Sequence, residues 1–483
     1  MTYHQRVCPI RRDPSPQSPT EYPRRGRGVA ATHCPQVLLH ERRPSALDRP
    51  RAVSIERGRS ASIEMLHPPP NDKARSASVI ACVFAMLSTI VGGGALSLPF
   101  ALKALGAGPG LLALLLAALA SDVSLLALCS ASRRTGLVAL PELARHCGGA
   151  GLEAACVACL LGLLCFCAVA YLRLLRDMVE VALGFDPGAV DGVLAAALGG
   201  VLLPLSLFDD VSRLAFAAAV SFAAAVLVAA TFWVRAPAAL GDHSWTELLE
   251  AKPEARSYFD ALGAVPIVSI LFLCQFNVLS VHAKLNDPTR DRLKMLVHTA
   301  VGLATVLYVV LGVGGLAVCK DVPLNVAQDA LACLAAADSD DAGVDPLLAG
   351  SAGAFGLAVL LNTPAIIIPL RDALVALPFV PKEAGGDGGA AWAGRVALTA
   401  FLIAGAFVGA VKAPGVAAVW AVAGSSVGLF ISYTLPCGLY LFVRRHKSWG
   451  HLLPCALIVL VSALLLAACL SRNVFIALMP GGQ

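Results

Sequence analysis

The stretch STIVGGGALSLPFA, residues 88–101, lies in the first long apolar segment of the chain and decides how that segment can fold. The consecutive residues Gly92, Gly93 and Gly94 are followed by Pro99 in a segment that is otherwise suited to a helix. Relative to alanine, glycine costs about 1 kcal/mol and proline about 3 kcal/mol in a helix interior. The segment is therefore predicted to break at the glycines.

A break inside a membrane has a functional meaning. Non-helical backbone persists there only where protein or a water-filled cavity satisfies its polar groups. The backbone N–H groups freed at the break can bind a carboxylate. The sequence therefore predicts a site for a carboxylate at Gly92, Gly93 and Gly94, with the Thr89 side chain beside it. A close-packed face of small residues is the alternative explanation for the glycines.

The composition indicates that most of the chain lies in a membrane. Hydrophobic residues make up 57% of the 483 residues and charged residues 14%, whereas soluble domains contain about 25% charged residues. The apolar residues form long blocks, as a helix that spans a bilayer requires, and not the short alternating segments of barrel strands. The predicted fold class is an all-α membrane protein. About 11 transmembrane helices are expected, at residues 78–102, 109–131, 153–176, 189–207, 212–234, 260–283, 294–318, 346–370, 394–411, 414–441 and 451–471.

The chain divides into a tail and a transmembrane domain. Residues 1–77 are rich in Arg, Pro and Ser and are predicted to form a disordered, basic tail. The positive-inside rule places this tail in the cytosol, near anionic lipid or a regulatory partner, with an organellar transit peptide as the alternative. The transmembrane domain is predicted at 78–471 and a short C-terminal tail at 472–483. Cys319 and Cys333 flank a loop outside the cytosol and could pair there.

The sixth predicted span contains a second group of polar residues, in FLCQFNVLSVHAKL at 272–285. Gln275 and Asn277 stand there in an otherwise apolar stretch, and polar side chains at membrane depth usually face a partner or a cavity. The first and sixth spans begin the two five-helix halves of an inverted-repeat transporter, which is where such proteins carry broken helices. Gln275 and Asn277 are therefore candidate substrate ligands. Hydrogen bonding between helices is the alternative.

Asp122 lies in the second span between apolar residues, with Ser121 and Ser124 nearby. An acidic residue at the centre of a membrane helix costs about 2.5–3.5 kcal/mol on insertion scales, so it should be neutralised, paired or open to a cavity. Burial favours the protonated form of a carboxyl group. Asp122 is thus a candidate for coupling a proton to transport, and a structural acid that holds the second helix is the alternative.

Several passages together resemble the amino acid/auxin permease family. STIVGGGALSLPFA is similar to the family's first-helix motif, and further passages follow in the family's order. Within them, Pro364 and Pro369 followed by Leu370 and Arg371 form the most specific pattern. The other passages are TGLVALPELARHCGG at 135–149, VAYLRLLRD at 169–177, LPLSLFDD at 203–210, NTPAIIIPLRDAL at 362–374 and AGSSVGLFISYTLPCGLYL at 423–441.

This resemblance implies a leucine-transporter-like fold, a 5+5 inverted repeat plus one helix, with an amino acid bound between the broken helices 1 and 6. It implies transport across a vacuolar, lysosomal or plasma membrane. Sodium-coupled members hold the ion with an Asn in helix 1 and a hydroxyl in helix 8, and the matching positions here are Ser88, Asn362 and Thr363. Since Ser88 replaces that Asn, proton coupling is preferred over sodium coupling. Cys274-Gln275 replaces a frequent Cys-His pair.

Classes of function other than transport find less support in the sequence. An embedded enzyme lacks support because the sequence has no HExxH motif and no cluster of metal ligands. A channel would need rings of charge or a filter motif, which are not visible. A transporter-like sensor of amino acids remains open, because only flux separates it from a carrier. We expect no cofactor other than the coupling ion, proton or sodium, and no nucleic acid partner. Neutral amino acids are the expected substrates because the predicted site contains no charged residue.

Overall fold

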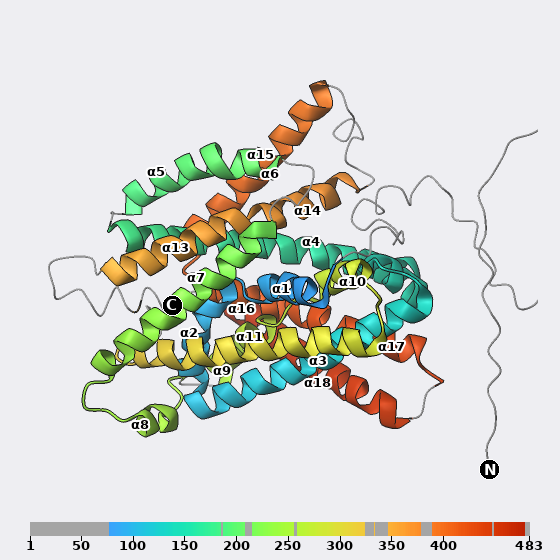
Figure 1. The fold of residues 1–483 in the computed structure, drawn as a ribbon, viewed down its shortest axis with the longest axis horizontal. Coiled ribbons are helices and arrows are strands. Elements are labelled where there is room, and N and C mark those ends of the chain that lie inside the picture. The colour runs from blue at the N-terminus through green and yellow to red at the C-terminus, as the bar shows by residue number, and fades with distance from the viewer. Residues whose placement is uncertain are drawn as a thin grey trace, which may run out of the picture. The chain divides into compact units, whose positions relative to one another are not determined.

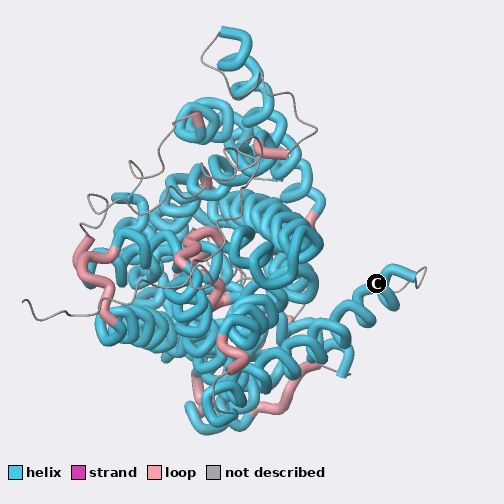
Figure 2. The backbone as a smooth tube through the Cα atoms, turned by 90° about the vertical axis from the view of Figure 1, so that its right-hand side faces the viewer, coloured by secondary structure: helices cyan, strands magenta, loops and turns pink. Residues whose placement is uncertain are grey.

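The computed structural model describes residues 77–184, 187–207, 215–255, 258–323, 333, 346–377, 389–446 and 449–478. Helices account for almost all of these residues, and the only extended pairing among them is an isolated bridge between Ala77 and Leu285 (Figure 2). The tail predicted at 1–77 lies outside the described residues except for Ala77. The last helix continues through the beginning of the C-terminal tail predicted at 472–483.

The helices follow one another without intervening strands in the described part of the chain (Figure 1). In chain order they are α1 (Val79–Ile90), η3 (Gly93–Ser97), α2 (Leu98–Leu105), α3 (Ala107–Thr135), α4 (Leu140–Leu183), α5 (Pro187–Ala197), η4 (Leu198–Leu202), α6 (Leu203–Ser206), α7 (Ala215–Leu240), α8 (Trp245–Glu250), α9 (Tyr258–Ile270), α10 (Gln275–Lys284), α11 (Arg290–Val318), α13 (Pro346–Asn362), α14 (Pro364–Val375), α15 (Gly389–Lys412), α16 (Val416–Ala423), η7 (Gly424–Gly428), η8 (Phe430–Thr434), α17 (Leu435–Val443) and α18 (Trp449–Leu478).

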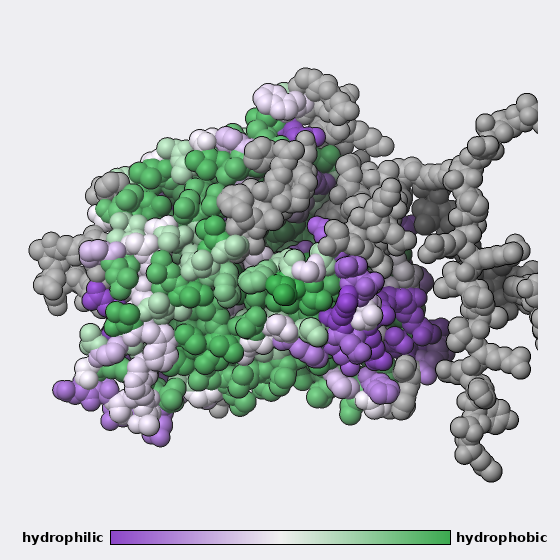
Figure 3. Space-filling model, viewed as in Figure 1, coloured by the Kyte–Doolittle hydropathy of each residue, from purple (hydrophilic) through white to green (hydrophobic). Residues whose placement is uncertain are grey.

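These helices provide up to eleven membrane spans. Nine are long and apolar enough to cross a bilayer, and two further spans are bent pairs of helices. Each corresponds to one of the spans expected from the sequence, so the predicted all-α membrane fold with about eleven spans is confirmed. Figure 3 shows the apolar residues as a broad band, with hydrophilic residues gathered at its margins. The chain is a multi-pass integral membrane protein.

The first span is broken, as its glycines predict. α1 ends at Ile90, and the following helical segment, which begins at Gly93, is bent by 47° relative to it. The tenth span is also bent, by 43°. Its bend follows the π-helical turn η7, where an ideal Cβ on Gly424 would lie 2.5 Å from the carbonyl oxygen of Pro266. Glycine at this position therefore allows the tenth span to approach α9 closely.

The sixth span is also interrupted, between Ile270 at the end of α9 and Gln275 at the start of α10. One side chain joins this break to the first one. The hydroxyl of Tyr308, on α11, lies 2.6 Å from the carbonyl oxygen of Ile90 and 2.9 Å from that of Leu271. The hydroxyl has a single proton to donate, so the two carbonyl groups share it. Tyr308 thus satisfies backbone groups that the two breaks release from their helices.

Two further contacts join distant helices. At the beginning of the first span, the N–H of Ala77 donates to the carbonyl of Lys284 at 3.1 Å, which holds the start of α1 beside the end of α10. In the Pro-Leu-Arg pattern of the eighth span, Arg371 is buried and donates through Nη1 to the carbonyl of Ser206 at 2.8 Å. Arg371 therefore ties α14 to α6.

Cys319 and Cys333 form a disulfide, with their Cα atoms 5.2 Å apart. The sequence left this pairing open, and the structure contains it. Because Cys319 directly follows α11, the disulfide fixes the end of that helix to the segment after it.

Candidate functional site

A small cavity lies at the break in the first span, where this span faces α4, α7 and α13. Its volume is about 10 Å³, enough for about one water molecule and far too small for an amino acid. The structure therefore shows a conformation in which the site is closed. The cavity is lined by Ser88, Val91, Gly92, Gly93, Tyr171, Ser221, Phe355, Ala358, Val359 and Asn362.

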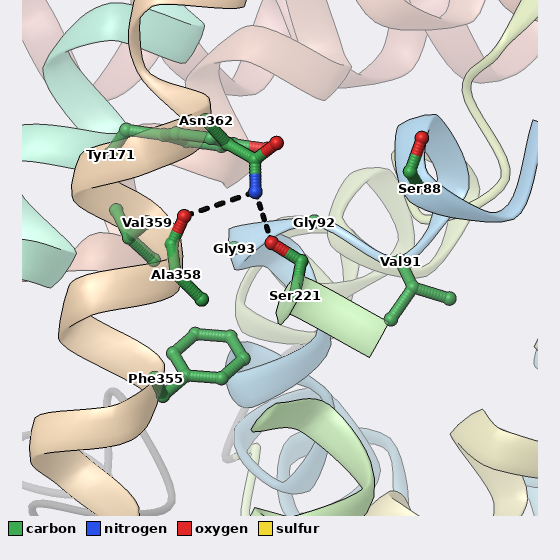
Figure 4. A pocket seen from close by; sticks show the side chains of 10 residues that line it. All are labelled: Ser88, Val91, Gly92, Gly93, Tyr171, Ser221, Phe355, Ala358, Val359 and Asn362. Carbon is green, nitrogen blue, oxygen red and sulfur yellow. Dashed lines mark hydrogen bonds between the residues drawn. The ribbon is translucent and has the colours of Figure 1, made fainter. Parts of the chain in front are cut away.

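The polar side chains of this cavity come from four spans, with Tyr171 contributed by α4. Asn362 points from α13 toward Ser221 on α7, and its Nδ2 donates to the Ser221 hydroxyl and, at 3.0 Å, to the carbonyl of Ala358 (Figure 4). Ser88 donates to the carbonyl of Ala85 at 2.9 Å. The structure thus brings together Ser88 and Asn362, two of the predicted ion-coupling residues. Ser221 was not predicted, although it is a polar residue in the apolar fifth span.

Thr363, the third predicted ion ligand from the resemblance, lies next to the cavity but does not line it. Its side chain is fully buried, and its hydroxyl donates to the carbonyl of Val359 at 2.7 Å. It could reach an ion only through a lone pair of the hydroxyl oxygen, because the proton is already engaged by the helix.

The three glycines of the break face different neighbours. An ideal Cβ on Gly92 would lie 2.7 Å from the Tyr171 hydroxyl, and one on Gly93 would lie 2.8 Å from Cδ2 of Leu174. Gly94 faces away from the cavity, where an ideal Cβ would approach Leu271 at 3.2 Å. The absence of side chains therefore lets the broken segment touch both α4 and the break in the sixth span.

Two of the predicted substrate ligands bind each other. Nδ2 of Asn277 donates to the hydroxyl oxygen of Thr89 at 2.8 Å, and the Thr89 hydroxyl donates to the carbonyl of Ala85 at 3.1 Å. This pair joins α1 to α10 next to the two breaks. Neither residue lines the cavity in this conformation.

Gln275 lies apart from the cavity, in contrast to its predicted place among the substrate ligands. Its side chain is fully buried, and its Nε2 donates to the hydroxyls of Ser121 at 3.2 Å and Ser124 at 3.0 Å. Its Oε1 accepts a hydrogen bond from the N–H of Cys274 at 3.0 Å. These are the bonds between helices that the sequence left as the alternative. They fix the start of α10 to α3.

Asp122, the predicted proton carrier, also lies away from the cavity. Its Oδ1 is 2.8 Å from Nδ1 of His298 on α11, and the exposed fractions of the two side chains are 18% and 54%. His298 was not predicted, because a partner from another span leaves no local signal in the sequence. The pair joins two groups that can each hold a proton.

Trp420 supplies an unoccupied hydrogen-bond donor beside the break. Its side chain is buried, and its Nε1 has no hydrogen-bond partner in the described structure. The same nitrogen lies 4.0 Å from the position of an ideal Cβ on Gly94, and the ring packs edge-on against Tyr171 with centroids 6.5 Å apart. Buried donors usually have partners, so a free one beside a helix break suggests a ligand group. Trp420 was not predicted from the sequence, because a single tryptophan in the apolar tenth span does not indicate whether its indole N–H faces a ligand.

The described residues contain no group of three or more His, Cys, Asp or Glu side chains that could hold a metal ion. The site consists of a broken helix, amide and hydroxyl groups and the aromatic rings of Tyr171, Phe355 and Trp420. Such a site can hold a small solute by hydrogen bonds and, through oxygen atoms, an alkali cation.

Comparison with known proteins identifies the family of the chain. Residues 75–476 match the family described as transmembrane amino acid transporter protein. The chain is 27% identical to "Putative sodium-coupled neutral amino acid transporter 11" of Danio rerio, over 51% of this chain and 56% of that protein, so the match spans little more than half of the relative. It is 24% identical to "Amino acid transporter AVT6A" of Arabidopsis thaliana, over 82% of this chain and 88% of that one.

Among solved structures, a manganese transporter of Eremococcus coleocola is similar over 82% of this chain and 94% of its own, with 12% identity and a TM-score of 0.49. The predicted family is confirmed by the match over residues 75–476, and this family comprises transporters and not enzymes. The chain belongs to the transmembrane amino acid transporter family.

Proposed function

We propose that this protein is a secondary active transporter that moves neutral amino acids by alternating access. The observation that carries the proposal is the break at Gly92 to Gly94, which faces hydroxyl and amide groups and no charged side chain among the cavity residues. A neutral amino acid needs donors for its carboxylate and no counter-charge for its side chain. The Danio rerio relative is named for neutral amino acids, which agrees with this substrate class.

In this proposal the substrate carboxylate binds at the start of η3, on the backbone around Gly92 and Gly93. The first N–H groups of a helical segment lack partners within that segment and favour negative charge. In this closed conformation the Gly92 N–H donates to the carbonyl of Ile90 at 2.8 Å, so a carboxylate bound there would replace that hydrogen bond. The Trp420 indole N–H is a further donor nearby. Because the closed cavity holds about one water molecule, substrate entry requires the broken segment to move away from α4 or α13.

For coupling, we infer a proton carried by the pair of Asp122 and His298. Their hydrogen bond at 2.8 Å joins α3 to α11, and α11 also carries Tyr308, which contacts both helix breaks. Lys294, one turn before His298, is the nearest charged residue on the same face of α11. A change of charge at the pair would alter how tightly α3 holds α11, and through Tyr308 it would bias both breaks.

A sodium ion is the second candidate for coupling. The cavity brings together oxygen atoms of Ser88, Ser221 and Asn362 next to the freed backbone, and Na⁺ in transporters is held by such oxygens and by unwound carbonyl groups. The Danio rerio relative is named as sodium-coupled. This arrangement keeps sodium as an alternative although Ser88 replaces the Asn of the family pattern.

Uptake by the purified protein in vesicles tests the function. We expect accumulation of radiolabelled small and hydrophobic neutral amino acids, driven by a pH gradient and independent of sodium. Replacement of Na⁺ by choline without a pH gradient distinguishes the two ions. Specific binding of an amino acid without any flux would favour the sensor, and preference for acidic or basic amino acids would contradict the substrate class.

An Asp122→Asn variant tests the coupling group. We expect it to keep exchange of substrate across the membrane but to lose the acceleration by an imposed pH gradient, because the amide cannot take up a proton in this range. Asp291→Asn is the matched control, since Asp291 lies in the exposed first turn of α11. If Asp122→Asn responds to the gradient as the wild type does, Asp122 is not the coupling group. Strict sodium dependence of the wild type would refute proton coupling as a whole.

A further inference from the structure

A second cavity lies away from the site at the helix breaks, at the end of the molecule predicted to face the cytosol. Its volume is about 520 Å³, and it opens between α3, α11, α17 and α18. Figure 3 shows hydrophilic residues gathered at the end of the molecule where α11 begins, next to the apolar band. The cationic residues that line this cavity are Arg133, Arg134, Arg290, Lys294 and Arg444, with His451 at the same opening.

The positive charge of this cavity is not neutralised within the described part of the chain. None of its five Arg and Lys residues forms an ion pair with a described carboxylate, and no acidic residue lines the cavity. Arg444 donates through Nη2 to the Ser130 hydroxyl at 3.0 Å, while its Nε is buried without a hydrogen-bond partner. The positive charges of these side chains repel one another, and the buried Nε–H of Arg444 costs free energy because it lacks a hydrogen-bond partner. The cavity is therefore suited to a ligand with several negative charges.

Part of the cavity wall is apolar. Val123 and Leu126 on α3, Leu293 on α11, and Pro454 on α18 line the cavity together with the cations. A soluble anion would gain nothing from these side chains, whereas a phospholipid would place its headgroup among the cations and its acyl chains along the apolar wall. The position of the cavity supports this, because the cytosolic leaflet is the anionic one.

We propose that this cavity binds a phospholipid of the cytosolic leaflet whose headgroup carries more than one phosphate group. Five cations exceed the charge of a single phosphodiester, and Arg133 with Arg134 at the opening can each form two parallel hydrogen bonds to a phosphate. Basic cavities between transmembrane helices on this side are suited to such headgroups. The site is separate from the proposed substrate site, and it adds a lipid partner to the transporter.

Binding of a fluorescent phosphatidylinositol bisphosphate to the full chain in phosphatidylcholine nanodiscs tests the proposal. We expect saturable binding that weakens about fivefold for each charge removed near the lipid surface, hence about 25-fold for Arg133→Gln with Arg134→Gln and about fivefold for Arg444→Gln. Arg292→Gln is the matched control, because Arg292 lies between Arg290 and Lys294 on α11 but pairs with Asp287 at 3.5 Å and does not line the cavity. Thermal unfolding of each variant checks that it is folded.

The source of the phosphate groups is tested by competition. Soluble inositol trisphosphate and inorganic phosphate should displace the labelled lipid only at concentrations far above that of unlabelled lipid, because they lack the acyl chains. The proposal is overturned if the soluble headgroup competes as well as the lipid. It is also overturned if Arg292→Gln weakens binding as much as the Arg133 and Arg134 variant does, since the effect would then be that of surface charge alone. The experiment measures lipid binding and not amino acid uptake. Failure of the transport proposal would therefore leave the lipid proposal unaffected.

Discussion

Replacing Gly93 by valine is expected to abolish uptake while the protein remains folded in the membrane. The first added carbon would lie 2.8 Å from Cδ2 of Leu174 and 3.5 Å from the Tyr171 ring, in a cavity with room for about one water molecule. Overpacking of this kind costs about 1–3 kcal/mol, which at about 1.4 kcal/mol for each factor of ten lowers the population of the closed conformation by about 5- to 140-fold. Occlusion of the carboxylate site adds to this, so transport should fall to background.

Two further variants separate the causes of that loss. Gly302→Val places the same side chain on α11, where nothing lies within 4 Å of an ideal Cβ, and should transport normally. Gly93→Val combined with Leu174→Ala relieves the contact with Leu174 but leaves valine over the backbone donors. If the donors bind substrate, the double variant stays inactive. Recovery of uptake in the double variant would show that Gly93 serves only packing, and full uptake by Gly93→Val would rule out the carboxylate site.

The sequence was sufficient for features that depend on local composition. Long apolar blocks predict spans because about 20 apolar residues in a helix cross the bilayer. The consecutive residues Gly92, Gly93 and Gly94 predict a break because each glycine makes the helix less stable, and three in a row add their costs. The bend of the tenth span was missed. It lies close to the approach of Gly424 to the carbonyl of Pro266, a contact between residues far apart in the chain that the local sequence does not reveal.

The site was only partly predictable, because a polar residue in an apolar span shows that a partner exists and not which one. Ser88 and Asn362 were expected from the resemblance and do line one cavity. Gln275 and Asn277 are both amides in the same apolar span, yet the Gln275 amide donates hydrogen bonds to the hydroxyls of Ser121 and Ser124 on α3. Only the packing of α10 against α3 distinguishes the two amides.

A buried lysine at the opposite end of the first span makes four polar contacts outside the two cavities. Lys103, on α2, is 6% exposed, and its Nζ donates to the carbonyls of Cys319 at 2.7 Å, Lys320 at 2.8 Å and Val322 at 2.5 Å. The same nitrogen lies 3.1 Å from Oε1 of Glu254. The last carbonyl groups of a helix lack partners within it and carry partial negative charge. Lys103 therefore caps the end of α11 and attaches the second half of the broken span to it.

The connection continues along the backbone. The N–H groups of Glu254 and Ala255 donate to the carbonyls of Lys103 and Ala104 at 3.2 and 3.3 Å. The disulfide between Cys319 and Cys333 holds the same end of α11. Lys103 therefore holds α2 to α11 at the end predicted to face away from the cytosol, while the bonds of Ala77 hold α1 beside α10 at the end predicted to face the cytosol.

Lys103→Met is accordingly expected to destabilise the protein and to loosen α2. Methionine keeps the apolar stem but removes the donors for the three carbonyl groups, and a hydrogen bond to a charged group contributes about 1.5–3 kcal/mol. Since Glu254 is 43% exposed and water can replace part of the loss, we expect a net cost of about 3 kcal/mol. Lys103→Arg should have an intermediate effect, because the planar guanidinium cannot reproduce three converging bonds. Thermal unfolding in detergent measures the change in stability. Lys320→Met is the control, because the Lys320 side chain makes only a 3.4 Å hydrogen bond to the carbonyl of Leu240 and a 3.7 Å contact with Asp321. An unfolding temperature of Lys103→Met equal to that of Lys320→Met would show that Lys103 does not hold the broken span to α11.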